Sequence, residues 1–296
     1  MTDQATGTGD RARPWHRAAI VLGLGLIAAP AIFQMFSRAP QGGEMIDEFR
    51  PYMTVSELSQ FDGYMDGIEA AVDELETAPA DDAPASVQTL VDQWPTIDDD
   101  MGGMLDVMSA NLDNFAAVDA LPPFPLFPWF FVAPGVLLIA FGAYGLLRRR
   151  PNPALAVIVL GWGLILAPVA FQMFERAPKG GDMLEELGPY MTADEVGAIQ
   201  GYFVTLGAAE GALRNQVLPA ADSPRPATES FVETWPQMAN DMAPMVGVMA
   251  DNLDNFAAVD ALPPFPLFPW FFVAPGVLAI VFGVLALRRA AEKESA

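Results

Sequence analysis

The chain contains no cysteine in its 296 residues, which excludes disulfide bonds, thiol catalysis and cysteine-ligated clusters. Its single histidine, His16, lies in a basic stretch before the first apolar run, so imidazole chemistry is not expected in the rest of the chain. The sequence also lacks a phosphate-binding glycine loop, a nucleophile elbow and a metalloprotease motif. We therefore predict that the protein is not an enzyme and needs no cofactor.

Charged residues are missing from four long windows of a chain that is 52% hydrophobic. Each window can cross a hydrocarbon core of about 30 Å at about 1.5 Å per residue. The windows are residues 18–36, 126–147, 154–174 and 267–287. We predict four transmembrane helices here. Because none of them holds a carboxylate, lysine or arginine, ion-coupled transport by the chain itself is not expected.

Arginines gather at one end of these windows: Arg11, Arg13 and Arg17 before the first, Arg148, Arg149 and Arg150 between the second and third, and Arg288 and Arg289 after the last. Loops rich in arginine favour the cytoplasmic side of a membrane. The tails 1–17 and 288–296 and the turn 148–153 are therefore predicted to be cytoplasmic. The long segments 37–125 and 175–266 are predicted to lie outside a bacterial plasma membrane.

The sequence repeats itself. Residues 111–137 recur without substitution at 252–278, and residues 30–54 share 16 of 25 positions with 168–192. Each repeat reads as a span, an outer module and a second span. Both repeats start and end on the same side, so parallel repeats related by a pseudo-twofold axis along the membrane normal are expected. The predicted fold is an all-α integral membrane protein with four transmembrane helices and an extracytoplasmic helical bundle in each repeat.

The outer modules carry helix signals. Thr54 with Glu57, and Thr192 with Glu195, have the spacing of a capping box at a helix start. Apolar residues at intervals of three and four follow the first box, which indicates one buried stripe up to about Glu76. A further helix is expected to begin after Pro95. We predict a separate antiparallel bundle for each module, without a sheet.

Acidic residues dominate both modules. Segment 37–125 holds 19 acidic and 2 basic residues, and segment 175–266 holds 14 and 4. Such charge repels nucleic acid and anionic headgroups, so neither is an expected partner of the modules. It also keeps exposed helices soluble, which is the simpler reading. The predicted partners are the lipid bilayer and a membrane or extracytoplasmic protein.

The doubled segment contains LPPFPLFPWFF, whose prolines predict an extended connector before Pro128. Every span also holds a proline toward its outer end, at 30, 134, 168 and 275, so a kinked bundle with a crevice between its halves is possible. The crevice candidates are Phe33, Phe36, Phe127, Trp129, Phe171, Phe174, Phe268 and Trp270. Plain anchoring of aromatic residues at the interface is the alternative. Glycines at 23, 25, 142, 145, 161, 163 and 283 favour close helix contact.

Methionines suggest a second chemistry, because thioethers favour Cu(I). The candidates share helical spacing in the two modules: Met101, Met104, Met108, Met242, Met245 and Met249. The same spacing suits an apolar core, and Met65 is replaced by Phe203 in the other repeat, as packing residues often are. Core packing is the preferred reading, and no metal is predicted.

Two arginines lie in the outer segments just after spans one and three. Arg38 and Arg176 are predicted to form ion pairs with Asp119 and Asp260 before the connectors, which would clamp the ends of one repeat. A plain interfacial arginine is the alternative.

Three functions follow in order of preference. The first is a non-enzymatic accessory subunit of an envelope complex, whose acidic modules bind a partner protein or ligand. The second is a lipid-handling or export component that uses an outer-leaflet crevice between the two halves. The third is Cu(I) binding through methionine.

Overall fold

The computed structural model describes residues 13–78, 83–148 and 152–294, and in these ranges it contains helices and no strand. Most of the predicted cytoplasmic tail 1–17 lies outside the described residues, as do Arg149 and Arg150 of the predicted turn. The chain divides into two units. The apolar unit comprises Met1–Gly43, Ala117–Gly181 and Ala258–Ala296, and the acidic unit comprises Glu44–Ala116 and Asp182–Ala257.

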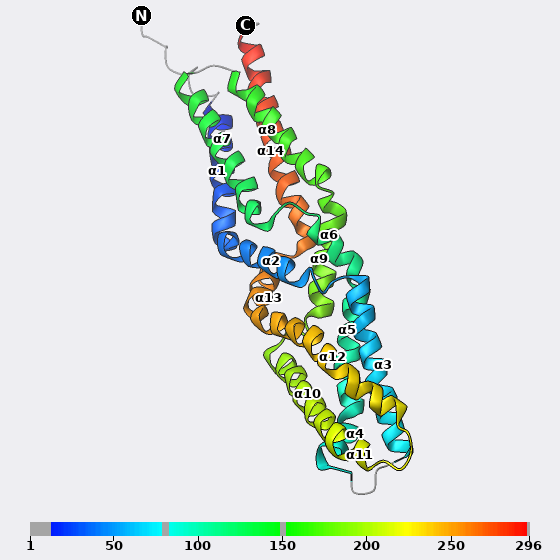
Figure 1. Cartoon of the computed structure of the whole chain (residues 1–296). Coiled ribbons are helices and arrows are strands. Elements are labelled where there is room, and N and C mark those ends of the chain that lie inside the picture. The colour runs from blue at the N-terminus through cyan, green and yellow to red at the C-terminus, as the bar shows by residue number, and fades with distance from the viewer. Residues whose placement is uncertain (1–12, 79–82, 149–151, 295–296) are drawn as a thin grey trace, which may run out of the picture. The chain divides into compact units, whose positions relative to one another are not determined.

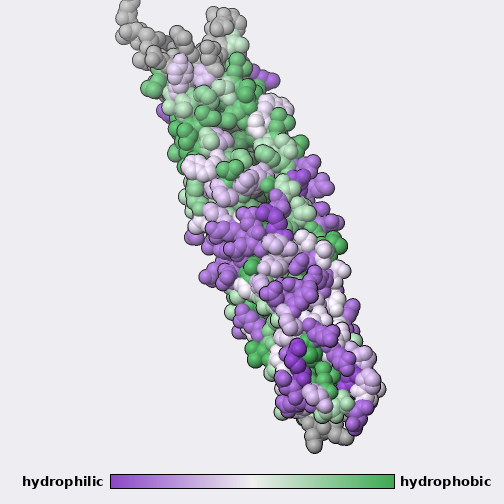
Figure 2. All heavy atoms as spheres, viewed as in Figure 1, coloured by the Kyte–Doolittle hydropathy of each residue, from purple (hydrophilic) through white to green (hydrophobic). Residues whose placement is uncertain are grey.

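Among its described residues, the apolar unit has four helices that are long and apolar enough to cross a membrane, over Pro14–Ile32, Phe124–Leu147, Pro153–Ala170 and Phe265–Arg289. They belong to α1 (Arg13–Ile32), α7 (Phe127–Arg148), α8 (Asn152–Ala170) and α14 (Phe268–Glu294). Helix α1 packs along α7 and α8 along α14, and the two pairs meet where α1 contacts α14 and α7 contacts α8 (Figure 1). An all-helical protein with four membrane-spanning candidates is thus confirmed, and the surface over these helices is largely hydrophobic (Figure 2).

Helices α1 and α8 end four residues before the predicted spans do. Gln34 and Gln172 each have a φ of 54°, in the left-handed region that interrupts an α-helix of L-residues. Helices α2 (Met35–Phe49) and α9 (Met173–Leu187) begin directly after them. The carbonyl oxygen of Gln34 accepts hydrogen bonds from the backbone N–H groups of Ser37 and Arg38, which starts the new helix. Hydropathy alone does not reveal such a break.

The connectors before α7 and α14 are extended only in part. Pro123 has a ψ of 127°, as expected for the residue before the aromatic run, but a 3₁₀ turn follows at η2 (Phe124–Leu126). The same turn recurs at η4 (Phe265–Leu267). Helix α7 therefore begins one residue before Pro128, with this proline in its first turn, where a missing N–H costs nothing.

The acidic unit is built from longer helices joined by short segments: α3 (Val55–Thr77), α4 (Ala85–Ile97), η1 (Asp98–Gly102), α5 (Gly103–Ala110), α10 (Ala193–Ala212), η3 (Leu213–Val217), α11 (Leu218–Ala220) and α12 (Pro226–Asp251). Helices α6 (Leu112–Asp119) and α13 (Leu253–Asp260) contribute residues to both units, as α2 and α9 do. The threonine half of each predicted capping box is confirmed, since the hydroxyl oxygens of Thr54 and Thr192 accept hydrogen bonds from the backbone N–H groups of Glu57 and Glu195.

The helix predicted to begin after Pro95 does not begin there. Pro95 lies inside α4, and the chain continues through the π-helical turn η1 into α5. Proline removes one backbone hydrogen bond, and a locally widened turn can absorb that loss without ending the helix. In the second repeat, α12 likewise runs through Pro236 and Pro244.

The two acidic segments do not form two separate bundles, which corrects the prediction from the sequence. Helix α3 of the first repeat packs mainly against α12 of the second, and α10 packs against both α4 and α12. The segments together form the acidic unit. Because the apolar stripes of the two repeats are alike, each can be buried against the other repeat as well as against its own.

Side-chain hydrogen bonds also join each repeat to the other. The buried amide of Asn111 donates to Glu186 at 2.7 Å, and that of Asn252 donates to Glu48 at 2.5 Å. Each amide also donates to a backbone carbonyl one turn earlier in its own helix. Buried polar groups need such partners, so these contacts fix how the two segments pair.

Candidate functional site

Glycines bring the membrane-spanning helices of each repeat into close contact. A Cβ atom at Gly23 would lie 2.5 Å from the carbonyl oxygen of Gly135, and one at Gly161 would lie 2.6 Å from that of Gly276. Close contact is thereby confirmed for five predicted glycines, at 23, 142, 145, 161 and 283. Gly135 and Gly276 make equally close contacts, with an added Cβ at 2.8 Å from the carbonyl oxygens of Gly23 and Gly161, and were not among the predicted glycines. Tight packing within each pair leaves room between the pairs.

An apolar groove of about 410 Å³ lies between α1 and α14. We call it the groove. One wall includes Val21, Gly25 and Ala29 of α1 and Phe33 directly after it, and the other wall includes Trp270, Phe271, Ala274 and Leu278 of α14. None of the described residues that line it has a charged or amide side chain, and Phe131 of α7 contributes as well. The groove thus joins the first span of one repeat to the last span of the other, which is where a crevice was predicted.

Three of the eight predicted crevice residues line the groove, namely Phe33, Phe268 and Trp270. Phe127 is buried against Phe268, with ring centres 6.3 Å apart. The others form aromatic pairs beside the groove or elsewhere in the apolar unit: Phe36 with Trp129 and Phe174 with Trp270, both edge to face at 5.8 Å, and Phe171 with Phe130 at 5.8 Å.

The small residues on the groove wall were not predicted from the sequence to line a crevice. At Gly25 an added Cβ would meet no other described atom within 4 Å, so this glycine opens space and does not serve helix contact. Gly25 and Ala29 are four residues apart and therefore lie along one face of α1. Phe33 follows after four more residues, in the turn directly after α1, where its backbone N–H donates to the carbonyl oxygen of Ala29. That spacing was a usable signal, although Gly23 and Gly25 cannot be told apart by residue type alone.

A far smaller cavity, of about 20 Å³, lies where the two repeats meet within the apolar unit. Equivalent residues of the two repeats line it in pairs, among them Met35 with Met173 and Phe124 with Phe265. An apolar space of this size offers no partners to a polar ligand and no room for a larger one. It marks the packed contact between the repeats.

The two arginines after α1 and α8 reach across to the opposite repeat. Nη1 of Arg38 donates to the carbonyl oxygen of Ala261 at 2.7 Å, and Nη1 of Arg176 donates to that of Ala120 at 2.6 Å. Each acceptor directly follows a helix, where backbone carbonyls lack intrahelical partners and attract cations. The accepting residues come one position after Asp260 and Asp119, and the predicted ion pairs with these carboxylates remain predictions.

The six methionines considered for Cu(I) are all buried in the acidic unit. Met104, Met108 and Met249 line an apolar cavity of about 40 Å³, together with methionines from α2 and α9. Among the described residues, no group of three or more His, Cys, Asp or Glu side chains could hold a metal ion. Flexible methionines fill irregular gaps where helices from two repeats meet, which accounts for their position.

Tyrosine and carboxylate pairs link the repeats within the acidic unit. The hydroxyl of Tyr64 donates to Asp241 at 2.7 Å, and that of Tyr202 donates to Asp100. This hydrogen bond, together with burial and the nearby charge of Asp100, raises the pKa of Tyr202 to about 12. Burial and the hydrogen bond to Asp241 also raise the pKa of Tyr64. Both phenols therefore stay neutral donors at physiological pH, which suits structural contacts.

Comparison with known proteins does not assign the chain to a family. A scan against protein-family models found no match, and a search of curated proteins found none.

Proposed function

We propose that this chain is a non-enzymatic, multi-pass membrane protein that binds an acyl chain of a bilayer lipid in the groove between α1 and α14. Of the three functions predicted from the sequence, the geometry favours lipid handling. The single observation that supports it is the 410 Å³ groove with its apolar lining. Sites for small ligands typically measure about 300–1,000 Å³.

The lining selects an apolar occupant. A polar or charged ligand would lose its hydrogen bonds to water and find no replacement among the groove's aliphatic and aromatic side chains. A lipid chain loses nothing by moving from the bilayer into the groove, and it gains contact with close-packed walls. Val21 and Trp270 are exposed at the groove, so the groove opens on the surface that the bilayer would cover.

The size favours a single chain over a transmembrane helix of a partner. A helix with its side chains is about 10–12 Å wide, and a 20-residue span is about 30 Å long. A volume of 410 Å³ holds only a small part of such a body. Large rings at Phe33, Trp270 and Phe271 also obstruct close approach of a second backbone, which helix association in membranes generally uses.

The arginine distribution supports an orientation for this proposal. With Arg17, Arg288 and Arg289 on the cytoplasmic side of a bacterial plasma membrane, the groove's aromatic end lies in the outer leaflet and the acidic unit lies outside the cell. The negative charge of the acidic unit would suit a partner protein that receives or delivers the lipid. The chain would then act as an accessory component in lipid transfer or export.

Photolabelling tests the proposal on the full chain. The purified protein is reconstituted in vesicles of phosphatidylethanolamine that carry a diazirine in the acyl chain, irradiated, and mapped by peptide mass spectrometry. We expect the label to concentrate on the groove walls, at Val21, Phe33 and Leu278. Equal labelling of lipid-facing positions outside the groove, such as Leu147 and Leu155, would show that the groove holds no preferred chain.

A further inference from the structure

We infer that the protein has a second acyl-chain site, on the seam between α7 and α8, with the same ligand class as the groove. This inference rests on the proposed function, because it assigns the same chemistry to another place. Helix α1 packs on α7 and α14, and α8 packs on the same two helices. The pair α1 and α7 and the pair α8 and α14 therefore lie between the groove and the seam of α7 with α8. The two sites would hold two different lipids.

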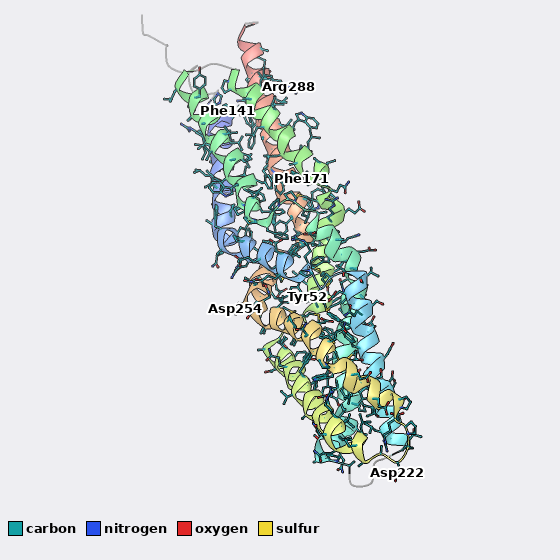
Figure 3. All side chains as sticks on the ribbon, in the orientation of Figure 1. Tyr52, Phe141, Phe171, Asp222, Asp254 and Arg288 are labelled. Atoms are coloured by element: carbon teal, nitrogen blue, oxygen red, sulfur yellow. The ribbon has the colours of Figure 1, made fainter. Side chains whose placement is uncertain are left out.

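The second seam has the same walls as the groove. On the α1 side, Val21, Gly25, Ala29 and Phe33 correspond to Val159, Gly163, Ala167 and Phe171 on the α8 side. Figure 3 labels Phe171, which directly follows α8. The α14 residues Trp270, Phe271, Ala274 and Leu278 fall in the doubled segment, and they correspond to Trp129, Phe130, Ala133 and Leu137 of α7. Not one of these eight pairs differs in residue type.

The second seam is also open to the same degree. Phe33 is 36% exposed and Phe171 is 37%, and Leu278 and Leu137 are 43% and 44% exposed. An added Cβ at Gly163 would meet no described atom within 4 Å, as at Gly25. The aromatic pair that crosses the first seam, Phe33 with Phe271 at 6.1 Å, has its counterpart in Phe171 with Phe130 at 5.8 Å.

The positions at which the first spans of the two repeats differ in sequence do not line these walls. Residues 18–36 and 156–174 differ at five of 19 positions: Ala19/Val157, Leu24/Trp162, Ala28/Leu166, Ala31/Val169 and Ile32/Ala170. Four of the five are exposed on α1, and none lines the groove. Exposed positions of this helix have therefore changed between the repeats, whereas exposed groove positions such as Val21 and Gly25 have not. A shared apolar ligand on both seams accounts for that contrast.

The number of tightly held lipids tests the inference. The full chain is reconstituted with isotopically labelled phosphatidylethanolamine, extracted in mild detergent and measured by native mass spectrometry. We expect two retained lipids in the wild type and one in Gly163→Phe or in Gly25→Phe. The double variant should retain none. At both positions an added Cβ meets no described atom within 4 Å, so neither substitution presses its Cβ against a neighbouring helix and the fold should persist.

Ala28→Leu is the matched control, because it adds bulk to the exposed surface of α1 outside the groove and copies the Leu166 of α8. It should retain both lipids. Ala167→Phe blocks the second seam at another position and should match Gly163→Phe, with thermal melting as the check on folding. If the wild type retained a single lipid, and this lipid were lost in Gly25→Phe but kept in Gly163→Phe, the second site would be contradicted. The groove itself would still be supported. Absence of any retained lipid, or two lipids in every variant, would overturn the proposed function too.

Discussion

The hydroxyl of Tyr64 on α3 donates a 2.7 Å hydrogen bond to the carboxylate of Asp241 on α12, although the two residues are 177 positions apart. The equivalent bond in the other direction joins Tyr202 on α10 to Asp100 in η1. Each repeat thus supplies the donor for one bond and the acceptor for the other. The acidic unit is held together by contacts that neither repeat can make by itself.

Replacing Tyr64 by phenylalanine should destabilise the acidic unit by about 1 kcal/mol, the usual net value of one partly buried hydrogen bond. Gln60 would still donate to Asp241 at 2.8 Å, so the carboxylate would keep a partner. Thermal unfolding followed by circular dichroism measures the change. Tyr202→Phe should have a similar effect. Tyr52→Phe is the control, because the Tyr52 hydroxyl makes no hydrogen bond to another described side chain, and an equal loss there would contradict the account.

The exchange of contacts predicts that the two repeats stay associated without a covalent link. A protease site placed in the segment 149–151, which joins α7 to α8, would allow the full chain to be cut after folding. We expect the fragments to elute together in mild detergent, because Arg38, Asn111 and Tyr64 all bond to the opposite repeat. Separation of the fragments without denaturant would show that these contacts are too weak to hold the repeats together.

Crowded carboxylates make the stability of the acidic unit pH-dependent. Burial raises the pKa of Asp62 above its ordinary 3.8, and the charges of Asp106 and Asp66 raise it further. A carboxyl with a raised folded-state pKa stabilises the fold below 3.8, and this contribution is lost as pH rises through the folded-state value. Asp62→Asn should therefore raise the unfolding temperature at neutral pH and have little effect below the ordinary aspartate pKa.

Glu69→Gln serves as the control for that experiment, since it removes one negative charge from an exposed position of the same helix. It accounts for the general benefit of lowering the net charge. If both variants gained equally at neutral pH, the crowding around Asp62 would not be the cause.

Glycine contact between α1 and α7 should be more sensitive to substitution than the open glycine nearby. Gly23→Ala would press its methyl group against the carbonyl oxygen of Gly135, and overpacking of this kind costs about 1–3 kcal/mol. Gly25→Ala meets open space and should be neutral or slightly stabilising, because alanine favours the helix. Thermal unfolding in detergent, followed by circular dichroism, compares the two. Equal losses would contradict the packing described for these helices.

Much of this fold follows from local sequence. Charge-free windows predicted the four spans, and Thr54 and Thr192 predicted two helix starts, because apolar length and capping chemistry are properties of adjacent residues. The ends of α1 and α8 were missed since Gln34 and Gln172 adopt a left-handed φ that their residue type does not announce. A backbone conformation that is rare for glutamine depends on the surrounding packing.

Pairing between the repeats was beyond local sequence. The apolar stripes of the repeats resemble each other, so their pattern cannot say whether α3 packs on its own repeat or on α12. The groove was foreseen as a place between the halves, and Phe33, Phe268 and Trp270 were foreseen on its walls. Gly25 was not, because only tertiary structure separates a glycine that touches a helix from one that leaves space.

The most direct test of the central claim is acyl-chain photolabelling of Gly25→Phe beside Ala28→Leu. The first substitution fills the groove between α1 and α14, and the second adds bulk on the same helix outside it. We predict that label on the α14 wall, at Phe271 and Leu278, is lost in Gly25→Phe and kept in Ala28→Leu. Undiminished labelling of this wall in Gly25→Phe would contradict a lipid chain held in the groove.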